Sequence, residues 1–553
     1  MKNDVSRTPR LRGARRLWPF AVAGVVSAAV LFAAAELVSA FFATASSPIV
    51  ALGAAFIDIT PPWLKDFAIA TFGTNDKLAL FISIGIVAAL VAAVTGVVAR
   101  RSFRGAALIV VALGVVVSLA VLSRPATGPL DLVPSVAGVA AGLGVLRLLV
   151  RRAAGIAAGA AGGSTDTNTD TAAGVPVHSD AGASADTSRS SGNPRRGNSR
   201  RGFLAAAGFA AVGAAALAAG GRALSGVRNA ALATRDALLL PAPRTAAPPL
   251  PDGVSAKVKG MPEFVTPNED FYRIDTALVV PRIEPADWEL RVHGMVEEEF
   301  TMTFDELLAL ELDETHVTLT CVSNPVGGDL VGNAKWLGYP LRKVLERARP
   351  TEGADMVLST SIDGFSASTP LEVLTDDRDA ILAVGMNGEP LPLEHGFPVR
   401  MVVPGLYGYV SATKWVVDLE VTRFADKVAY WTTRGWSDRG PIKLASRVDV
   451  PRSFARVPAG TVAIGGTAWA QQRGIDSVQV RLDDGEWVEA KLAAEASVDT
   501  WRQWSHEWKD ATPGLHTVTV RAIDADGEVQ TEERADPVPN GASGWHRLQF
   551  TVE

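Results

Sequence analysis

The only cysteine of the 553-residue chain, Cys321, lies where an alternating apolar run meets a glycine-rich loop that contains Asn324, Gly327 and Gly328. A single thiol excludes an internal disulfide and any zinc or iron–sulfur site that needs several cysteines. A lone cysteine is commonly a small buried apolar residue. A thiolate beside glycine-relaxed backbone also suits one soft metal atom whose other ligands come from a cofactor. Both interpretations stay open at this point.

A second cluster of chemically capable residues follows some seventy to ninety positions later. It begins with His395-Gly-Phe-Pro-Val-Arg400, passes through a Pro-Gly turn at 404–405, and ends at Lys414-Trp415. Three potential cations around relaxed backbone are what a phosphate group requires. The alternative is a surface hairpin with solvated charges and a capping histidine.

Taken together, the two clusters resemble the sulfite oxidase family of molybdopterin-dependent oxidoreductases, over roughly the C-terminal half of the chain from about residue 262. Cys321 and Asn324 match the family's Thr-Leu-x-Cys-x-x-Asn segment. The second cluster matches its His-Gly-x-Pro-x-Arg segment and the Lys-Trp pair that follows. Phe271-Tyr272-Arg273 looks like the family's upstream arginine segment.

This resemblance implies a Mo-molybdopterin cofactor, with Cys321 as the protein's metal ligand, and two-electron oxygen-atom transfer to or from a small-molecule substrate. It implies catalytic roles for Cys321, Arg273 and Trp436. The cofactor-binding residues that it implies are Tyr272, Arg273, Asn324, His395, Arg400, Lys414 and Trp415. The sequence has no Cys-x-x-Cys-His haem motif, so we expect a separate electron carrier, either a cytochrome or a quinone-linked protein.

Several positions depart from the family pattern. Pro325 and Val326 stand where sulfite-oxidising relatives carry arginines, and Trp436 replaces their active-site tyrosine. Ile274-Asp275 stands where Asn-His is common. Each change removes a contact for an anion, so we expect sulfite to bind weakly. The alternatives are a sulfoxide or N-oxide reductase on the same scaffold, or a non-catalytic membrane-tethered binding protein.

The N-terminal part is strongly apolar, which explains the mean hydropathy of +0.18 for the whole chain. Apolar runs at 17–42, 78–99, 106–123 and 130–150 approach or reach membrane-spanning length. Arginines cluster before the first run, between the second and third, and after the fourth, so the positive-inside rule places these segments in the cytoplasm. We therefore predict a four-helix domain over 1–152 in a multi-pass cell-membrane protein.

Residues 153–201 are polar and small, as in a disordered cytoplasmic linker. The linker ends in Ser199-Arg200-Arg201-Gly-Phe203-Leu204, which resembles a twin-arginine export signal before a fifth apolar segment at 202–222. The alternative is an ordinary fifth helix flanked by cytoplasmic arginines. Both interpretations put the C-terminal half on the extracytoplasmic side. If the segment is an export signal that is not cleaved, it remains as a membrane anchor.

The remaining sequence predicts two globular domains. Alternating strands with short helices at 304–310 and 341–347 predict an α+β domain of the sulfite oxidase type over 255–425. Short strands with turn signals at Asp483-Asp-Gly485 and Asp524-Ala-Asp-Gly527 predict an immunoglobulin-like β-sandwich over 440–553. We expect the nearby tryptophans, at 501, 504 and 508, to lie in its core. In the family such a domain commonly mediates dimerisation, which stays open here.

The charge of the chain argues against nucleic acid as a partner. The formal net charge is −6 at pH 7, and no patch of basic residues is interleaved with aromatic ones.

Overall fold

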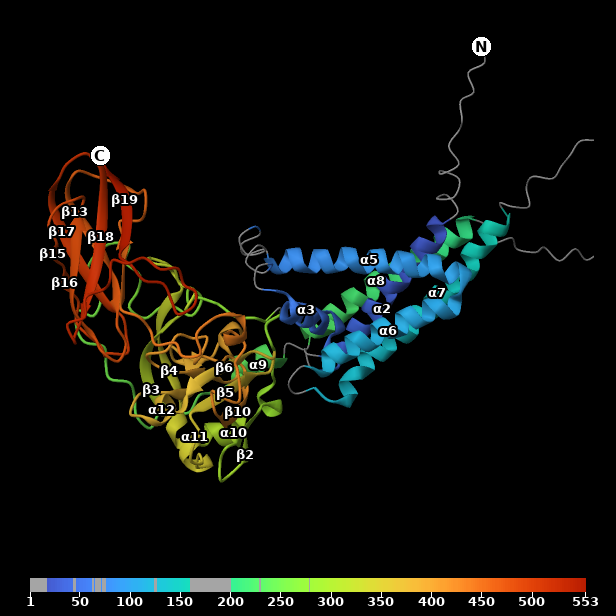
Figure 1. Cartoon of the computed structure of the whole chain (residues 1–553), viewed down its shortest axis with the longest axis horizontal. Coiled ribbons are helices and arrows are strands. Elements are labelled where there is room, and N and C mark those ends of the chain that lie inside the picture. Colours follow the sequence, from blue (N-terminus) through green and yellow to red (C-terminus); the bar gives the residue numbers. More distant parts are fainter. Residues whose placement is uncertain are drawn as a thin grey trace, which may run out of the picture. The chain divides into compact units, whose positions relative to one another are not determined.

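The computed structural model describes residues 17–42, 46–61, 64, 71, 76–123, 127–159, 200–227, 230–277 and 279–553. The chain divides into two units, the first over 1–123 and 127–226 and the second over 124–126 and 227–553 (Figure 1). Each is described by itself. Most of the predicted linker, residues 160–199, lies outside the described residues.

The first unit is a helix bundle. Its helices are α2 (Trp18–Ser39), α3 (Pro48–Ile59), α5 (Asp76–Arg101), α6 (Phe103–Leu122), α7 (Val133–Gly159) and α8 (Arg200–Val227). Within the described residues, five helical segments are long and apolar enough to cross a membrane: Trp18–Ser39, Ala79–Arg101, Phe103–Leu122, Pro129–Gly155 and Arg201–Gly220. They coincide with the four predicted spans and the fifth apolar segment.

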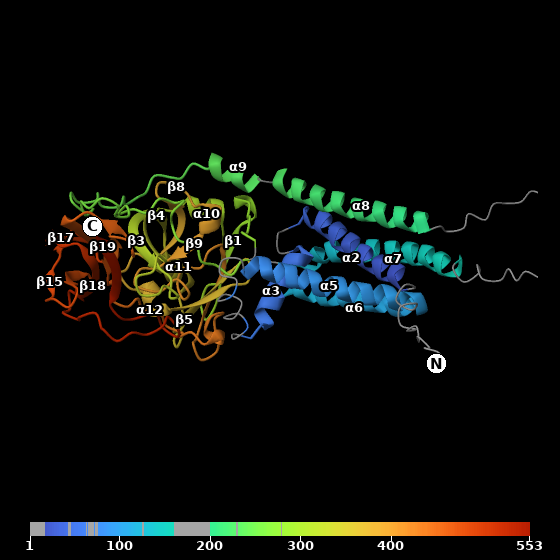
Figure 2. The same ribbon diagram turned by 90° about the horizontal axis from the view of Figure 1, so that it is seen from above.

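Small residues let helix α2 approach its neighbours closely. A Cβ added to Gly24 of α2 would overlap the backbone oxygen of Ala92 in α5, and one added to Gly138 of α7 would lie 2.7 Å from the backbone oxygen of Leu31. In lipid such close backbone packing replaces the hydrophobic effect as the force that joins helices. Helix α8 runs alongside this group (Figure 2), with Phe203 buried against Phe20.

The second unit begins with α9 (Ala230–Ala237) and contains an α+β domain with two sheets. The first sheet has the order β2-β1-β10-β5-β6, in which only β1 and β10 are parallel. Its strands are β1 (Glu289–Gly294), β2 (Phe300–Thr303), β5 (Met356–Ser361), β6 (Ser366–Pro370) and β10 (Val416–Thr422). Helices α10 (Phe304–Leu308), α11 (Leu341–Ala348) and α12 (Leu371–Thr375) pack against its core. The first two confirm the predicted short helices.

The second sheet of this domain positions the two predicted clusters. It has the order β3-β4-β7-β8, with β9 paired to β7. Its strands are β3 (Asp313–Thr320), β4 (Val331–Pro340), β7 (Ile381–Met386), β8 (Glu389–Pro390) and β9 (Arg400–Val402). Cys321 directly follows β3, and Arg400 opens β9. The antiparallel pairing of β3 with β4 and of β4 with β7 therefore brings segments about eighty residues apart into one sheet.

The C-terminal domain consists of two sheets around one core, as predicted for a β-sandwich (Figure 1, orange to red). One sheet has the order β11-β13-β17-β16 and the other β12-β19-β18-β14-β15. The strands are β11 (Ala445–Val450), β12 (Arg456–Val457), β13 (Gly460–Trp469), β14 (Ile475–Leu482), β15 (Val488–Glu489), β16 (Lys491–Leu492), β17 (Arg502–Ala511), β18 (Gly514–Asp524) and β19 (His546–Val552). Trp504 is buried in the core of this domain and Trp508 packs against it, which confirms their predicted place. The prediction is wrong for Trp501, which is buried in the core of the α+β domain, where its indole N–H donates to the oxygen of Phe264 at 3.0 Å.

Candidate active site

Cys321 begins a compact loop that its own backbone holds closed. The Cys321 N–H donates to the oxygen of Leu330 at 3.0 Å, and the Leu330 N–H donates to the Asn324 side-chain oxygen at 3.0 Å. Cys321 as a residue is half-buried, its Sγ lies 3.0 Å from the Ser323 hydroxyl, and burial raises the pKa of the thiol. A half-buried residue whose sulfur lies beside a hydroxyl group differs from a cysteine packed wholly among apolar side chains. Asn324, predicted to bind the cofactor, shapes this loop.

Two tyrosines connect Cys321 electrostatically with the second cluster. Burial raises the pKa of Tyr272, and the charge of Cys321 raises it further while that of Arg400 lowers it. Tyr272 is thus close enough to both groups to respond to each. Burial likewise raises the pKa of Tyr407 to about 12, with a contribution from Cys321. The N–H of the next residue, Gly408, donates to the backbone oxygen of Thr320, so the Pro-Gly turn reaches the end of β3.

Arg400 is a buried cation, only 5% exposed, whose hydrogen bonds in the described part of the chain go to carbonyl oxygens. Its guanidinium donates to His395 at 3.1 Å, Met401 at 3.3 Å and Ala412 at 3.5 Å, and lies 5.1 Å from the ring centroid of Trp336. Burial lowers its pKa to about 10, so it remains charged at neutral pH. A buried charge without a counter-ion is costly, so this position favours binding of an anion.

His395 corrects one expectation. It was predicted as one of three cations, but burial and then the charge of Arg400 lower its pKa to about 4, so the imidazole is neutral at pH 7. Its Nε2 lies 3.1 Å from the backbone oxygen of Asn268, which only accepts, so Nε2 carries the proton. The ring packs edge-on against Phe271, with centroids 5.5 Å apart.

Lys414 and Arg273 share one carboxylate. The Lys414 Nζ donates to Asp275 Oδ2 at 2.8 Å, and the Arg273 Nε donates to the same oxygen at 2.9 Å. Burial would raise the pKa of Asp275, but the charges of Lys414 and Arg273 bring it below its ordinary value. Burial lowers the pKa of Lys414 to about 8, although Asp275 opposes the shift. The negative charge expected of Asp275 thus lies inside the predicted cation cluster.

The two tryptophans among the predicted site residues, Trp415 and Trp436, lie in different places. Trp415 follows Lys414 in the left-handed conformation (φ 51°), and its indole N–H donates to the oxygen of Leu393 at 3.0 Å, beneath the Lys414 ammonium. Trp436 packs against Tyr409 and Trp431, with centroids 5.9 and 6.2 Å apart. Neither of these ring contacts involves Cys321, so the catalytic role of Trp436 stays a prediction.

A small cavity of about 30 Å³ lies between the Cys321 loop and the C-terminal domain. Its lining includes Thr320, Val326, Tyr407 and Gln530. Within the described part of the chain, no charged side chain lines it. The Thr320 hydroxyl is buried without a hydrogen-bond partner in the described part of the chain. Sequence analysis missed Tyr407 and the contribution of the C-terminal domain, since only the fold brings them to the loop.

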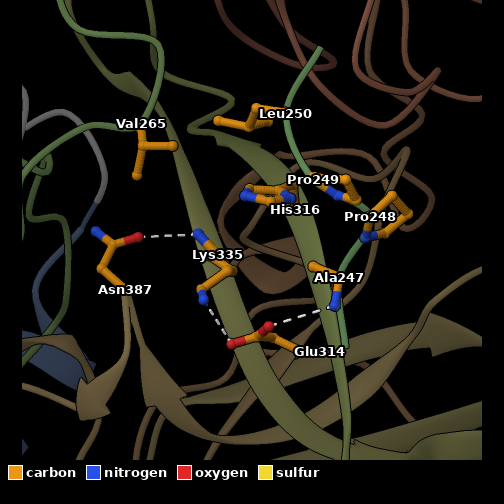
Figure 3. Close-up of a pocket in the computed structure, with 9 residues that line it drawn as sticks. All are labelled: Ala247, Pro248, Pro249, Leu250, Val265, Glu314, His316, Lys335 and Asn387. Carbon is orange, nitrogen blue, oxygen red and sulfur yellow. Dashed lines mark hydrogen bonds and ion pairs between the residues drawn. The ribbon is translucent and has the colours of Figure 1, made fainter. Parts of the chain in front are cut away.

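A larger pocket of about 330 Å³ lies at the other end of the same strands. Figure 3 shows His316 and Lys335 beside the proline-rich segment that contains Pro248, with Lys335 paired to Glu314 at 2.7 Å. His316 precedes Cys321 by five strand residues, a separation of about 17 Å. This pocket is therefore distinct from the Cys321 loop and carries none of the predicted residues.

The residues fit a molybdopterin cofactor by the chemistry of their donors. In the described residues no group of three or more His, Cys, Asp or Glu side chains could hold a metal ion by itself. A metal at Cys321 would therefore take its other ligands from a cofactor. Arg400, which pairs with no carboxylate in the described part of the chain, and Lys414, which pairs with Asp275, would supply the cations for that cofactor's phosphate.

Comparison with known proteins supports this assignment. A family model described as the oxidoreductase molybdopterin-binding domain matches residues 277–431. Mitochondrial sulfite oxidase of Drosophila melanogaster is 31% identical over 359 residues, which cover 54% of this chain and 60% of that protein. The chain thus spans less than two thirds of that relative. The uncharacterized oxidoreductase YuiH of Bacillus subtilis is 31% identical over 153 residues, 28% of this chain and 74% of YuiH.

Among solved structures, the sulfane dehydrogenase SoxCD from Paracoccus pantotrophus matches with a TM-score of 0.47 and 24% identity, covering 53% of this chain and 84% of that one.

The low pKa of Lys414 should make retention of the cofactor pH-dependent. Between about pH 7 and pH 9.5 Lys414 loses its proton while a phosphate keeps its charge, so the phosphate loses one charged hydrogen bond. We expect binding about tenfold weaker at the higher pH, measured as molybdenum retained after gel filtration. Lys414→Arg keeps its charge at both values and should retain molybdenum equally. Equal pH dependence in Lys414→Arg and the unaltered chain would contradict this role.

Proposed function

Because the chain belongs to the sulfite oxidase family of molybdopterin-dependent oxidoreductases, we propose that it is a membrane-anchored molybdenum oxidoreductase that catalyses oxygen-atom transfer outside the cytoplasm. The observation that carries the proposal is the half-buried Cys321 at the start of its loop, with Tyr272 close enough to feel the charges of both Cys321 and the buried cation Arg400. A soft ligand and a buried anion site belong at the two ends of a metal-pterin cofactor.

Each residue has a distinct part in this proposal. Cys321 ligates the metal through sulfur, and Arg400 and Lys414 bind the phosphate, with Trp415 packed beneath Lys414. His395 is neutral, is held in place by its bond to the backbone oxygen of Asn268, and accepts a bond from Arg400 through its own backbone oxygen. When bound, Mo-molybdopterin supplies the two-electron chemistry and the protein supplies position, charge and access. Arg273 and Trp436 are proposed at the substrate side.

The five apolar helices support membrane anchoring. The arginines at the ends of the spans favour a cytoplasmic N-terminus and an extracytoplasmic catalytic domain. Helix α8, which follows the twin arginine, buries Phe203 and Ala207 against α2 and α7. This packing favours a retained fifth helix over a cleaved signal.

Electron transfer requires a second protein in this proposal. The single cysteine excludes a Cys-x-x-Cys-His haem site, so electrons pass between the cofactor and a separate cytochrome or quinone-linked carrier. We assign the C-terminal sandwich to the immunoglobulin-like class, and the family resemblance makes it the surface through which two copies would pair.

A second candidate concerns the substrate. Pro325 and Val326 line the cavity beside the Cys321 loop, and within the described part of the chain no charged side chain lines it. Asp275 also pairs with Arg273, the cation proposed nearest the substrate. A site without unpaired cations binds a dianion weakly, so a neutral sulfoxide or N-oxide suits it better than sulfite.

Replacing Cys321 by Ser tests the central assignment. The fold should survive, because Cys321 is a half-buried residue whose sulfur lies beside the Ser323 hydroxyl, a setting that accepts a serine, but turnover should fall to background. Activity with artificial electron dyes, molybdenum content and Tm measure the three effects. Ser323→Ala, whose hydroxyl is the neighbour of the thiol, is the matched control and should keep most activity.

Two outcomes would overturn the assignment. A fully active Cys321→Ser variant excludes the thiol as the metal ligand. Absence of molybdenum from the natively purified chain, in place of about one atom per chain, supports the non-catalytic binding protein instead.

Val326→Arg tests the substrate class. The new guanidinium restores a cation beside the loop, so kcat/KM for sulfite should rise by about tenfold or more, while that for a neutral sulfoxide should not. Val326→Met, which adds length without charge, controls for the change in shape. Efficient sulfite oxidation by the unaltered chain, with no activity on neutral oxides, would refute the neutral-substrate candidate.

Replacing both Arg200 and Arg201 by Lys distinguishes recognition of a twin-arginine signal from the effect of positive charge alone. The positive charge that orients α8 is kept, so only recognition of the twin arginine is lost. We expect the catalytic domain to become inaccessible to protease added outside the cell, and the chain to keep its full length in both forms, as seen with tags at each end. A C-terminal fragment that lacks α8 would show cleavage and contradict retention.

A further inference from the structure

Two side chains of the C-terminal domain contact the loop that follows Cys321. Arg447 of β11 donates through Nη1 to the backbone oxygen of Gly328 at 2.9 Å. His546, the first residue of β19, lies against Gly327, where an added Cβ would overlap the Nε2–Cδ2 edge of the imidazole. Gly327 also has φ +77°, which other residues rarely adopt. Only a glycine therefore allows this contact.

Both side chains are themselves firmly held. Arg447 is 7% exposed, forms an ion pair with Asp449 at 2.8 Å, and lies 5.7 Å from the ring centroid of Trp501. The Nδ1 of His546 accepts the N–H of Val448 at 3.0 Å, so the neutral ring carries its proton on Nε2, at the edge that faces Gly327. Burial and then the charge of Arg447 lower the pKa of His546 to about 4, which keeps the ring neutral.

The loop needs support at the place where these residues touch it. Its start is fixed by the bonds between Cys321, Asn324 and Leu330, and a turn joins the Gly328 N–H to Pro325 at 2.9 Å. Pro325 is exposed, and the small cavity lies beneath the loop. A loop with a cavity on one side and solvent on the other keeps one conformation only if something anchors its far end.

We propose that Arg447 and His546 are positioning residues that anchor the Gly327–Gly328 end of the loop and so fix the direction of the Cys321 sulfur. The C-terminal domain then supports the metal site directly, in addition to any role in assembly. This inference rests on the proposed function, in which Cys321 is the metal ligand.

The single cysteine provides a direct measurement. In full-length chain purified from a host that does not make the cofactor, the alkylation rate of Cys321 by iodoacetamide reports how often the loop opens. Arg447→Lys keeps a charge for Asp449 but cannot reach both partners, and His546→Ala removes the ring from Gly327. We expect each to label about tenfold faster than the unaltered chain, at a denaturant concentration far below unfolding.

Arg473→Lys is the matched control, because Arg473 belongs to the same domain and pairs with Asp524 and Glu528. It should leave labelling unchanged. In chain loaded with cofactor, Arg447→Lys should also alter the electron paramagnetic resonance signal of the reduced metal while molybdenum content is retained.

If Arg447→Lys and His546→Ala lower Tm but leave both labelling and the resonance signal as in the Arg473→Lys control, the two residues merely stabilise the domain interface and the inference is refuted. Failure of the proposed function looks different. In that case Cys321→Ser keeps its molybdenum and activity, whatever the labelling rates show.

Discussion

The buried guanidinium of Arg400 is the constraint on which the rest of the catalytic domain depends. A charge placed this deep is tolerated only if its surroundings supply oriented dipoles, and here three carbonyl oxygens come from three separate stretches of backbone. Those stretches are β9, the turn at His395 and the loop at Ala412. The position of Arg400 therefore fixes the path of the chain from His395 to Trp415, and that path in turn carries the Gly408 N–H to the end of β3.

The Cys321 loop is governed by a different kind of constraint, because its sequence leaves one end without support. Gly327 and Gly328 permit a tight turn but cost conformational entropy, since glycine loses the most freedom on folding. The catalytic domain closes the start of this loop with backbone bonds. The C-terminal domain contacts its far end through Arg447 and His546. Both domains thus hold the Cys321 loop in place. This is consistent with the cavity that residues of both domains line, and with their belonging to one compact unit.

Sequence reasoning located the parts of the site that lie within short motifs. Cys321, Arg400, Lys414 and the five apolar helices could be found because residue type and local spacing carry the signal. It failed where tertiary packing decides. A histidine beside two basic residues looks like a third cation, yet burial makes His395 neutral. Arg447 and His546 lie more than a hundred residues beyond Cys321, and no local pattern connects them with it. The pairing of Asp275 with Lys414, 139 residues further along the chain, is a contact of the same long-range kind.

Under the proposed function, the charges of Arg273, Asp275, Lys414 and Arg400 would let one site hold an anionic cofactor and still disfavour an anionic substrate. Arg273, Lys414 and Arg400 set three positive charges against one from Asp275, which leaves an excess of two positive charges that would balance a phosphate dianion. The carboxylate of Asp275 lies closer to two of these cations than to the third, because in the described part of the chain it pairs with Arg273 and Lys414 but not with Arg400. Positive potential is therefore strongest at the buried guanidinium and weakest at Arg273, whose side chain is 42% exposed. Coulomb attraction falls with both distance and solvent screening, so a dianionic substrate near Arg273 would meet a cation already paired with Asp275, while a phosphate near Arg400 would meet a cation bonded only to carbonyl oxygens in the described part of the chain.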